Sequence, residues 1–251
     1  MQPMEAAAPP PPPPPPPASP RRSIDVGRVI SETFSIYGNN AAPLLITAFI
    51  VFLIVGLIQG LLGDGFILQM IGTIISMIAT ALYTGFVVKL VEDVRDGRRD
   101  FSVGELISSA SPFIVPLIIN GFLRGIAVAI GLVLLIVPGL ILLTIWAVTS
   151  PAIVVENEGA MSAFGRSSDL TRGERMNVFL AILVVFVITF VISFIVLAIG
   201  ASLGTGALIA LAILVSTLTQ PIAAIVAAVL FFDLGGGSGG SAGGGQVVVE
   251  Y

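Results

Sequence analysis

Residues 41–88 contain two long apolar runs and a three-residue connector: AAPLLITAFIVFLIVGLIQGLL (41–62), GDG (63–65) and FILQMIGTIISMIATALYTGFVV (66–88). Each run reaches the roughly 20 residues that a helix needs to cross a hydrocarbon core about 30 Å thick. The connector is long enough only for a tight turn, so the two runs form a helical hairpin. This stretch predicts an all-α membrane protein.

Four further apolar runs follow this hairpin, at 112–136, 139–155, 176–200 and 207–232. Val137-Pro138-Gly139 is expected to turn the chain between the third and fourth runs, of which the fourth is the shortest. The composition agrees, because 56% of the residues are hydrophobic and only 10% are charged, against about 25% in soluble domains. The predicted fold is polytopic, with about six transmembrane helices arranged as three hairpins.

Two tails flank a helical membrane domain at 23–234. Residues 1–22 are a disordered, Pro-rich N-terminal tail with nine consecutive prolines, which form a polyproline II rod. Residues 235–251 are a Gly-rich, flexible C-terminal tail. Either tail is a spacer or a binding segment for a protein partner.

An amphipathic stretch precedes each hairpin, at 23–37, 101–111 and 159–172. The middle stretch opens with a capping box, because Ser102 is followed three residues later by Glu105. The first stretch has two interpretations that the sequence leaves open. Its basic end lies against anionic lipid headgroups, or its apolar face packs on the helical bundle.

Ten of the eleven Lys and Arg residues fall before the first span and in the even-numbered gaps between spans. The odd-numbered gaps have none, so the positive-inside rule places both termini in the cytoplasm. Six of the ten are expected to be cytoplasmic and to face lipid headgroups: Arg21, Arg22, Arg28, Arg166, Arg172 and Arg175.

The eleventh basic residue, Arg124, is the one charge expected inside a span. Counted from residue 112 it lies about 18 Å along the helix, near the bilayer midplane, where an arginine costs about 2.5–3.5 kcal/mol on insertion scales. Asn120 lies one turn away, and Gln220 is expected at a similar depth in the sixth span. These three residues form a candidate contact site for an anion or a lipid phosphate. The alternative is that Arg124 snorkels or is interfacial.

The residue types present do not support a catalytic function. The chain contains neither cysteine nor histidine, which removes thiolate and imidazole ligands together with the commonest general base. No nucleophile elbow, phosphate-binding glycine loop or metal signature is visible, so no cofactor or metal is expected. The basic segments are mixed with acids, so nucleic-acid binding is not expected either.

A family resemblance rests on three stretches: LLIVPG (134–139), GAMSAFGRSSDLTRGERMNVF (159–179) and QPIAAIVAAVLFFDL (220–234). Together they resemble the glycerophosphoryl diester phosphodiesterase membrane-domain family of bacterial multi-pass proteins. The resemblance implies a helical region of the bacterial inner membrane. It does not imply phosphodiesterase activity, because the catalytic barrel would need about 250 further residues and this chain has no histidine.

The sequence therefore predicts a non-catalytic, multi-pass inner-membrane protein whose partners are membrane lipids and, through its tails, a protein. The favoured role is that of an accessory or scaffold protein. The alternative is a small transporter or lipid-handling permease that uses the anion site near Arg124.

Overall fold

The computed structural model describes residues 23–62, 65–97, 102–200 and 204–237. Every regular element within these ranges is helical, which confirms the all-α fold class. In chain order the elements are α1 (Val26–Asn39), α2 (Ala41–Leu62), α3 (Phe66–Arg95), α4 (Val103–Ala110), the 3₁₀ turn η1 (Ser111–Phe113), α5 (Ile114–Leu134), α6 (Ile136–Ile145), α7 (Thr149–Glu156), α8 (Ser162–Leu170), α9 (Arg175–Gly200) and α10 (Thr205–Asp233).

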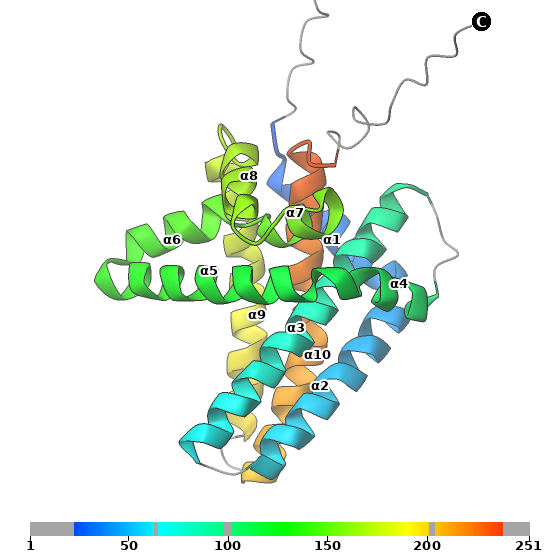
Figure 1. Ribbon diagram of the computed structural model, residues 1–251, viewed down its shortest axis with the longest axis vertical. Helices are drawn as coiled ribbons and strands as arrows, with labels where there is room; N and C mark the ends of the chain where they lie inside the picture. Colours follow the sequence, from blue (N-terminus) through cyan, green and yellow to red (C-terminus); the bar gives the residue numbers. More distant parts are fainter. Residues whose placement is uncertain (1–22, 63–64, 98–101, 201–203, 238–251) are drawn as a thin grey trace, which may run out of the picture.

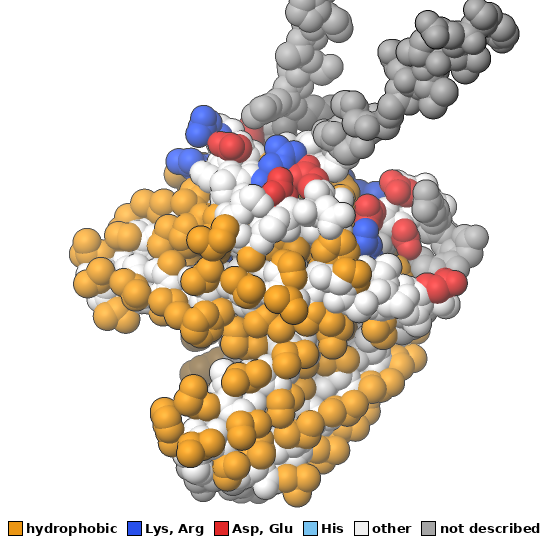
Figure 2. Space-filling view, in the orientation of Figure 1, with side chains coloured by type: hydrophobic (Ala, Val, Ile, Leu, Met, Phe, Trp, Pro, Cys, Tyr) orange, Lys and Arg blue, Asp and Glu red, His pale blue; other side chains and the backbone are white. Residues whose placement is uncertain are grey.

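Four long helices, α2, α3, α9 and α10, run together along the long axis of the molecule (Figure 1). Helix α10 packs against the other three. The hairpin of α5 and α6 lies across these helices instead of along them, and it packs on α3, α7 and α9. Charged side chains gather at one end, which we term the charged end, while apolar side chains cover the rest of the visible face (Figure 2).

Six helical stretches of the described residues are long and apolar enough to cross a membrane, as the sequence predicted. The middle pair departs from the expected boundaries. The turn between them lies at Leu135, whose backbone is extended (φ −158°, ψ 133°), and not at 137–139. Pro138 falls in the first turn of α6, where a missing N–H removes no helical hydrogen bond. The predicted fourth span is divided between α6 and α7.

The three predicted amphipathic stretches are confirmed as α1, α4 and α8. Helix α4 begins with the expected capping box, in which the Ser102 and Glu105 side chains each accept a hydrogen bond from the other residue's backbone N–H. Helix α1 buries Val29, Thr33 and Ile36 against α9 and α10. The structure thus favours bundle packing for the first stretch, although its opposite face still carries charge.

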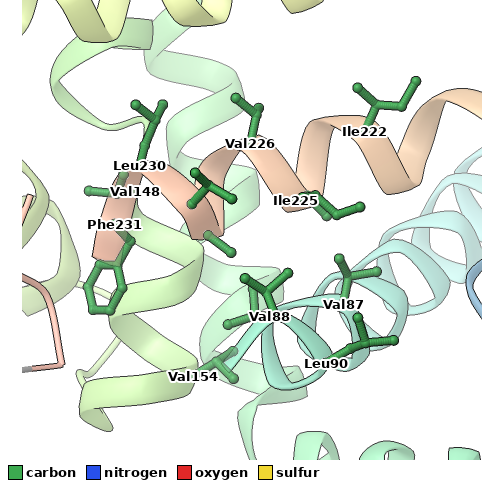
Figure 3. Close-up of a cluster of buried hydrophobic side chains, with 14 of the residues drawn as sticks. Val87, Val88, Leu90, Val148, Val154, Ile222, Ile225, Val226, Leu230 and Phe231 are labelled. Atoms are coloured by element: carbon green, nitrogen blue, oxygen red, sulfur yellow. The ribbon is translucent and has the colours of Figure 1, made fainter. Parts of the chain in front are cut away.

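Buried apolar side chains join α3, α7 and α10 in one core (Figure 3). Val88 of α3, Ile153 of α7 and Leu230 of α10 are completely buried. Helix α7 was expected to be the end of a lipid-exposed span, yet it is enclosed by protein. Its apolar residues are therefore core residues.

Ion pairs tie the elements of the charged end together. The Asp233 carboxylate at the end of α10 accepts hydrogen bonds from Arg28 of α1 (2.7 Å) and Arg95 of α3 (3.1 Å). Arg95 also pairs with Glu32 at 2.6 Å. Hydrogen bonding to Asp233 raises the pKa of Arg28 above its ordinary value. This network closes the bundle where three helices meet.

Candidate anion-binding cavity

Arg124 projects from α5 into the interior of the membrane domain. Its Nη1 donates to the Trp146 carbonyl and to the Thr149 hydroxyl, both at 3.4 Å. No carboxylate forms a salt bridge with it in the part of the chain that the structure describes. Two long hydrogen bonds from one nitrogen leave most of the five guanidinium donors without a protein acceptor.

The acceptors of Arg124 belong to the turn between α6 and α7, which α8 holds in place. The Ser167 hydroxyl of α8 donates to the Ile145 carbonyl (2.8 Å) and accepts from the Val148 N–H (3.3 Å). The Trp146 ring stacks edge-on against Phe164 of the same helix, with centroids 4.7 Å apart. Helix α8 therefore sets the position of the carbonyl that Arg124 meets.

Ser167→Ala is expected to destabilise the protein by about 1–3 kcal/mol, because the buried Val148 N–H loses its partner. Thermal unfolding in detergent measures this, with the neighbouring Ser168→Ala as the control. Equal melting temperatures for the two variants would show that the turn does not depend on Ser167.

Arg124 lines two adjoining cavities, each of about 320 Å³. One lies between α3 and α5, and the other lies between α3, α9 and α10. Thr80, Thr84 and Ser150 line both cavities together with Arg124. The arginine is thus surrounded by hydroxyl groups in an otherwise apolar region.

A polar face of α3 continues this lining along the membrane domain. Thr73, Ser76, Thr80 and Thr84 recur at three- or four-residue intervals and all line the first cavity. Ser76 and Thr80 also line a third cavity of about 330 Å³, between α2, α3 and α10. This periodicity was visible in the sequence, but it was masked by the high hydrophobicity of the run.

The structure brings together two of the three predicted site residues. Gln220 lines the second cavity with Arg124 and the third cavity as well. Asn120 does not line these cavities. Its amide donates to the Ala160 carbonyl at 2.8 Å, and the side chain is buried, so it holds the segment between α7 and α8.

The predicted lipid-facing arginines that the structure describes lie at the charged end (Figure 2). Arg28 pairs with Asp233, and Arg166 donates to both oxygens of Glu156 at 2.5 and 2.6 Å. The hydrogen bond with Glu156 raises the pKa of Arg166. Of the remaining four residues in this set, Arg172 and Arg175 are exposed, and Arg21 and Arg22 lie outside the described residues. Contact with lipid headgroups stays a prediction for all six.

Chemically, the cavity offers one cation and several hydroxyl and amide donors. Such a set suits a tetrahedral oxyanion, since guanidinium groups bind phosphate through charge-assisted hydrogen bonds. No group of acidic, histidine or cysteine side chains that could hold a metal occurs among the described residues. The lining residues include no nucleophile with an adjacent general base.

Comparisons with known proteins point to uncharacterised membrane proteins. The sequence model of a domain of unknown function (DUF7847) matches residues 38–234. A UPF0259 membrane protein of Pectobacterium carotovorum subsp. carotovorum (strain PC1) is 35% identical over 103 residues, which are 41% of this chain and 40% of that protein. The chain thus spans about two fifths of the length of that relative. No solved structure matches the chain.

These matches overturn the resemblance to the glycerophosphoryl diester phosphodiesterase membrane-domain family, since neither points to it. Most residues in the quoted stretches are small or apolar, as multi-pass helices and their short connectors require. Such residues do not distinguish one multi-pass family from another. Neither matching name states a catalytic activity.

Proposed function

Because the chain belongs to the DUF7847 family, whose function is unassigned, we propose its role from the Arg124 cavity: it is a non-catalytic membrane protein that binds and handles a phosphate-type anion. The observation that carries the proposal is an arginine without a carboxylate partner among the described residues, facing two cavities lined by hydroxyl groups. Arg124 is half-buried in apolar surroundings, and a charge withdrawn from water costs free energy unless a partner offsets it. The anion is that partner.

The polar face of α3 supports handling as well as binding. Its hydroxyl groups extend from the Arg124 cavities to the third cavity, where Gln59 donates to the Ser76 hydroxyl at 2.5 Å. An anion that dissociates from Arg124 could bind next to the hydroxyl groups on this face of α3. The arrangement favours the small transporter or lipid-handling permease that was the alternative prediction.

The sidedness of the proposed protein follows from its basic residues. Arg28, Lys89, Arg95 and Arg166 belong to the charged end, and the positive-inside rule places such an end in the cytoplasm. We therefore assign the protein to the bacterial inner membrane with both termini cytoplasmic. The accessory or scaffold role, in which the protein packs against lipid or a partner, stays a prediction. The tails at 1–22 and 235–251, its candidate segments for binding a protein, lie largely outside the described residues.

The test is lipid and anion binding by wild-type protein and by Arg124→Gln. Loss of charge-assisted hydrogen bonds worth about 1.5–3 kcal/mol is expected to weaken binding about 10- to 100-fold. Native mass spectrometry with phosphatidylglycerol and phosphatidylcholine measures lipid adducts, and thermal shifts with glycerol phosphate measure a free anion. A phosphatidylglycerol adduct lost in Arg124→Gln identifies a lipid, and a lost glycerol-phosphate shift identifies a solute.

The matched control is Arg172→Gln, which removes the same charge from a side chain that is 73% exposed. Because Arg172 does not line the Arg124 cavities, this variant is expected to give the wild-type thermal shift with glycerol phosphate. If Arg124→Gln does not accumulate, Thr80→Val with Thr84→Val removes two hydroxyl donors without touching the charge, and it should also weaken binding. Wild-type affinity in every variant that folds would refute the anion site.

A further inference from the structure

The α5–α6 hairpin raises a question that length and composition do not answer, namely whether it crosses the membrane. A crossing α6 would begin at the end of the molecule opposite the charged end and run antiparallel to α9. Its first turn would then lie beside the last turns of α9. In the structure the first turn of α6 does not lie beside the last turns of α9.

Both ends of α6 lie beside the beginning of α9. Val137 in the first turn of α6 and Ile145 at its end line one apolar cavity of about 350 Å³ with Arg175, Met176 and Phe179. Helix α9 begins at Arg175, and its other end, at Gly200, packs against Leu208 and Leu211 of α10. Helix α6 therefore lies across the start of α9, as Figure 1 shows.

The length of α6 agrees with this placement. Its ten residues span about 15 Å, half of a hydrocarbon core of about 30 Å. The chain then turns into α7, which is enclosed by α3, α8 and α10. The segment 136–156 is thus a short apolar helix followed by a core helix, not one continuous lipid-exposed span.

The tip of the hairpin is exposed and carries no charged residue. All residues at 132–138 are exposed, with Val133 at 86% and Leu134 at 72%. No Lys, Arg, Asp or Glu occurs at 125–155. An apolar surface of this kind has to be covered. It continues the apolar surface of the bundle in Figure 2.

The backbone of the tip is also compatible with lipid. The Leu135 N–H donates to the Gly131 carbonyl at 3.0 Å, and Pro138 has no N–H. Unsatisfied backbone groups are what exclude irregular segments from hydrocarbon. Neither of these two positions therefore adds an unpaired N–H group at the break.

We infer that the α5–α6 hairpin lies within the leaflet at the charged end and does not cross the membrane, so that α2, α3, α9 and α10 are the crossing helices of the described residues. The occupant of its exposed surface is the acyl region of that leaflet. Because a hairpin that crosses twice and one that does not cross leave the chain on the same side, the distribution of basic residues fits both. The inference does not depend on the proposed anion.

This placement also changes the depth of Arg124. In a crossing helix it would lie near the midplane, whereas in a hairpin within one leaflet it lies nearer the headgroups. The free energy of holding an arginine in hydrocarbon falls toward the interface. The cost that the proposed anion offsets is then that of the apolar lining of the two cavities, and not that of the bilayer midplane.

Cysteine labelling tests the inference cleanly, because the chain has no cysteine of its own. Single variants Leu135→Cys, Gly65→Cys, Gly206→Cys and Arg172→Cys are exposed to a membrane-impermeant maleimide in right-side-out and inverted vesicles. Gly65 and Gly206 lie at the turns opposite the charged end, and they should be labelled from one side. Arg172 should be labelled from the other side.

Leu135→Cys is expected to stay unlabelled from the Gly65 side while reacting fully after solubilisation in detergent. A fluorophore attached at this cysteine should be quenched by lipids that carry a nitroxide on the acyl chain, and one at Arg172→Cys should not. Labelling of Leu135→Cys from the Gly65 side would overturn the inference, because only a crossing hairpin brings the tip there. Absence of lipid quenching would overturn it as well.

Discussion

Replacing Asp233 by alanine is expected to lower the melting temperature of the purified protein by about 4–8 °C, from a loss of about 2 kcal/mol. The carboxylate is only 5% exposed, and it accepts hydrogen bonds from arginines on two other helices. Without it, among the described residues, Arg28 keeps only Glu32 at 3.3 Å and Arg95 keeps only Glu32 at 2.6 Å. The expected loss is below that of a fully buried pair, because the Arg28 side chain is 51% exposed.

The control for Asp233→Ala is Asp169→Ala, which removes the same group from a surface pair. Asp169 and Arg172 are 66% and 73% exposed and lie 3.3 Å apart. Exposed pairs contribute about 0–1 kcal/mol, so this variant should melt close to the wild type. Equal losses in the two variants would mean that the network does not close the bundle.

Replacing Gly131 or Gly139 by alanine is expected to force α5 and α6 apart. Each substitution should lower the free energy of unfolding by about 1–3 kcal/mol. A Cβ on Gly131 would lie 2.9 Å from the Gly139 Cα, and one on Gly139 would lie 2.7 Å from the Leu132 backbone nitrogen. Backbone atoms cannot move aside as a flexible side chain can. The two glycines therefore set the spacing of the hairpin.

The same helix supplies the controls for this prediction. A Cβ at Gly121 or Gly125 would meet no atom within 4 Å. Alanine there should be neutral or stabilising, by up to about 1 kcal/mol, because it favours the helix. Thermal unfolding of all four alanine variants measures the difference in stability. If Gly121→Ala lost as much stability as Gly131→Ala, the close-contact explanation would be contradicted.

The residues of the candidate site were partly predictable. Arg124 is the one charge in a long apolar run, and this is evident without coordinates. The residues around Arg124 are not evident from the sequence, because they come from distant segments of the chain. Helical spacing suggested Asn120, which binds the Ala160 carbonyl instead, while the turn at Trp146 and the hydroxyl face of α3 supply the surroundings.

The sequence by itself determined the membrane class, the helical segments and the amphipathic helices α1, α4 and α8, because hydropathy and local spacing are properties of contiguous residues. Only the tertiary structure decided where those segments lie. An apolar residue has the same hydropathy whether it faces lipid, as at Val133, or the protein core, as at Ile153. Contacts between distant segments, such as Gly131 with Gly139 and Val137 with the start of α9, turned the middle hairpin across the bundle.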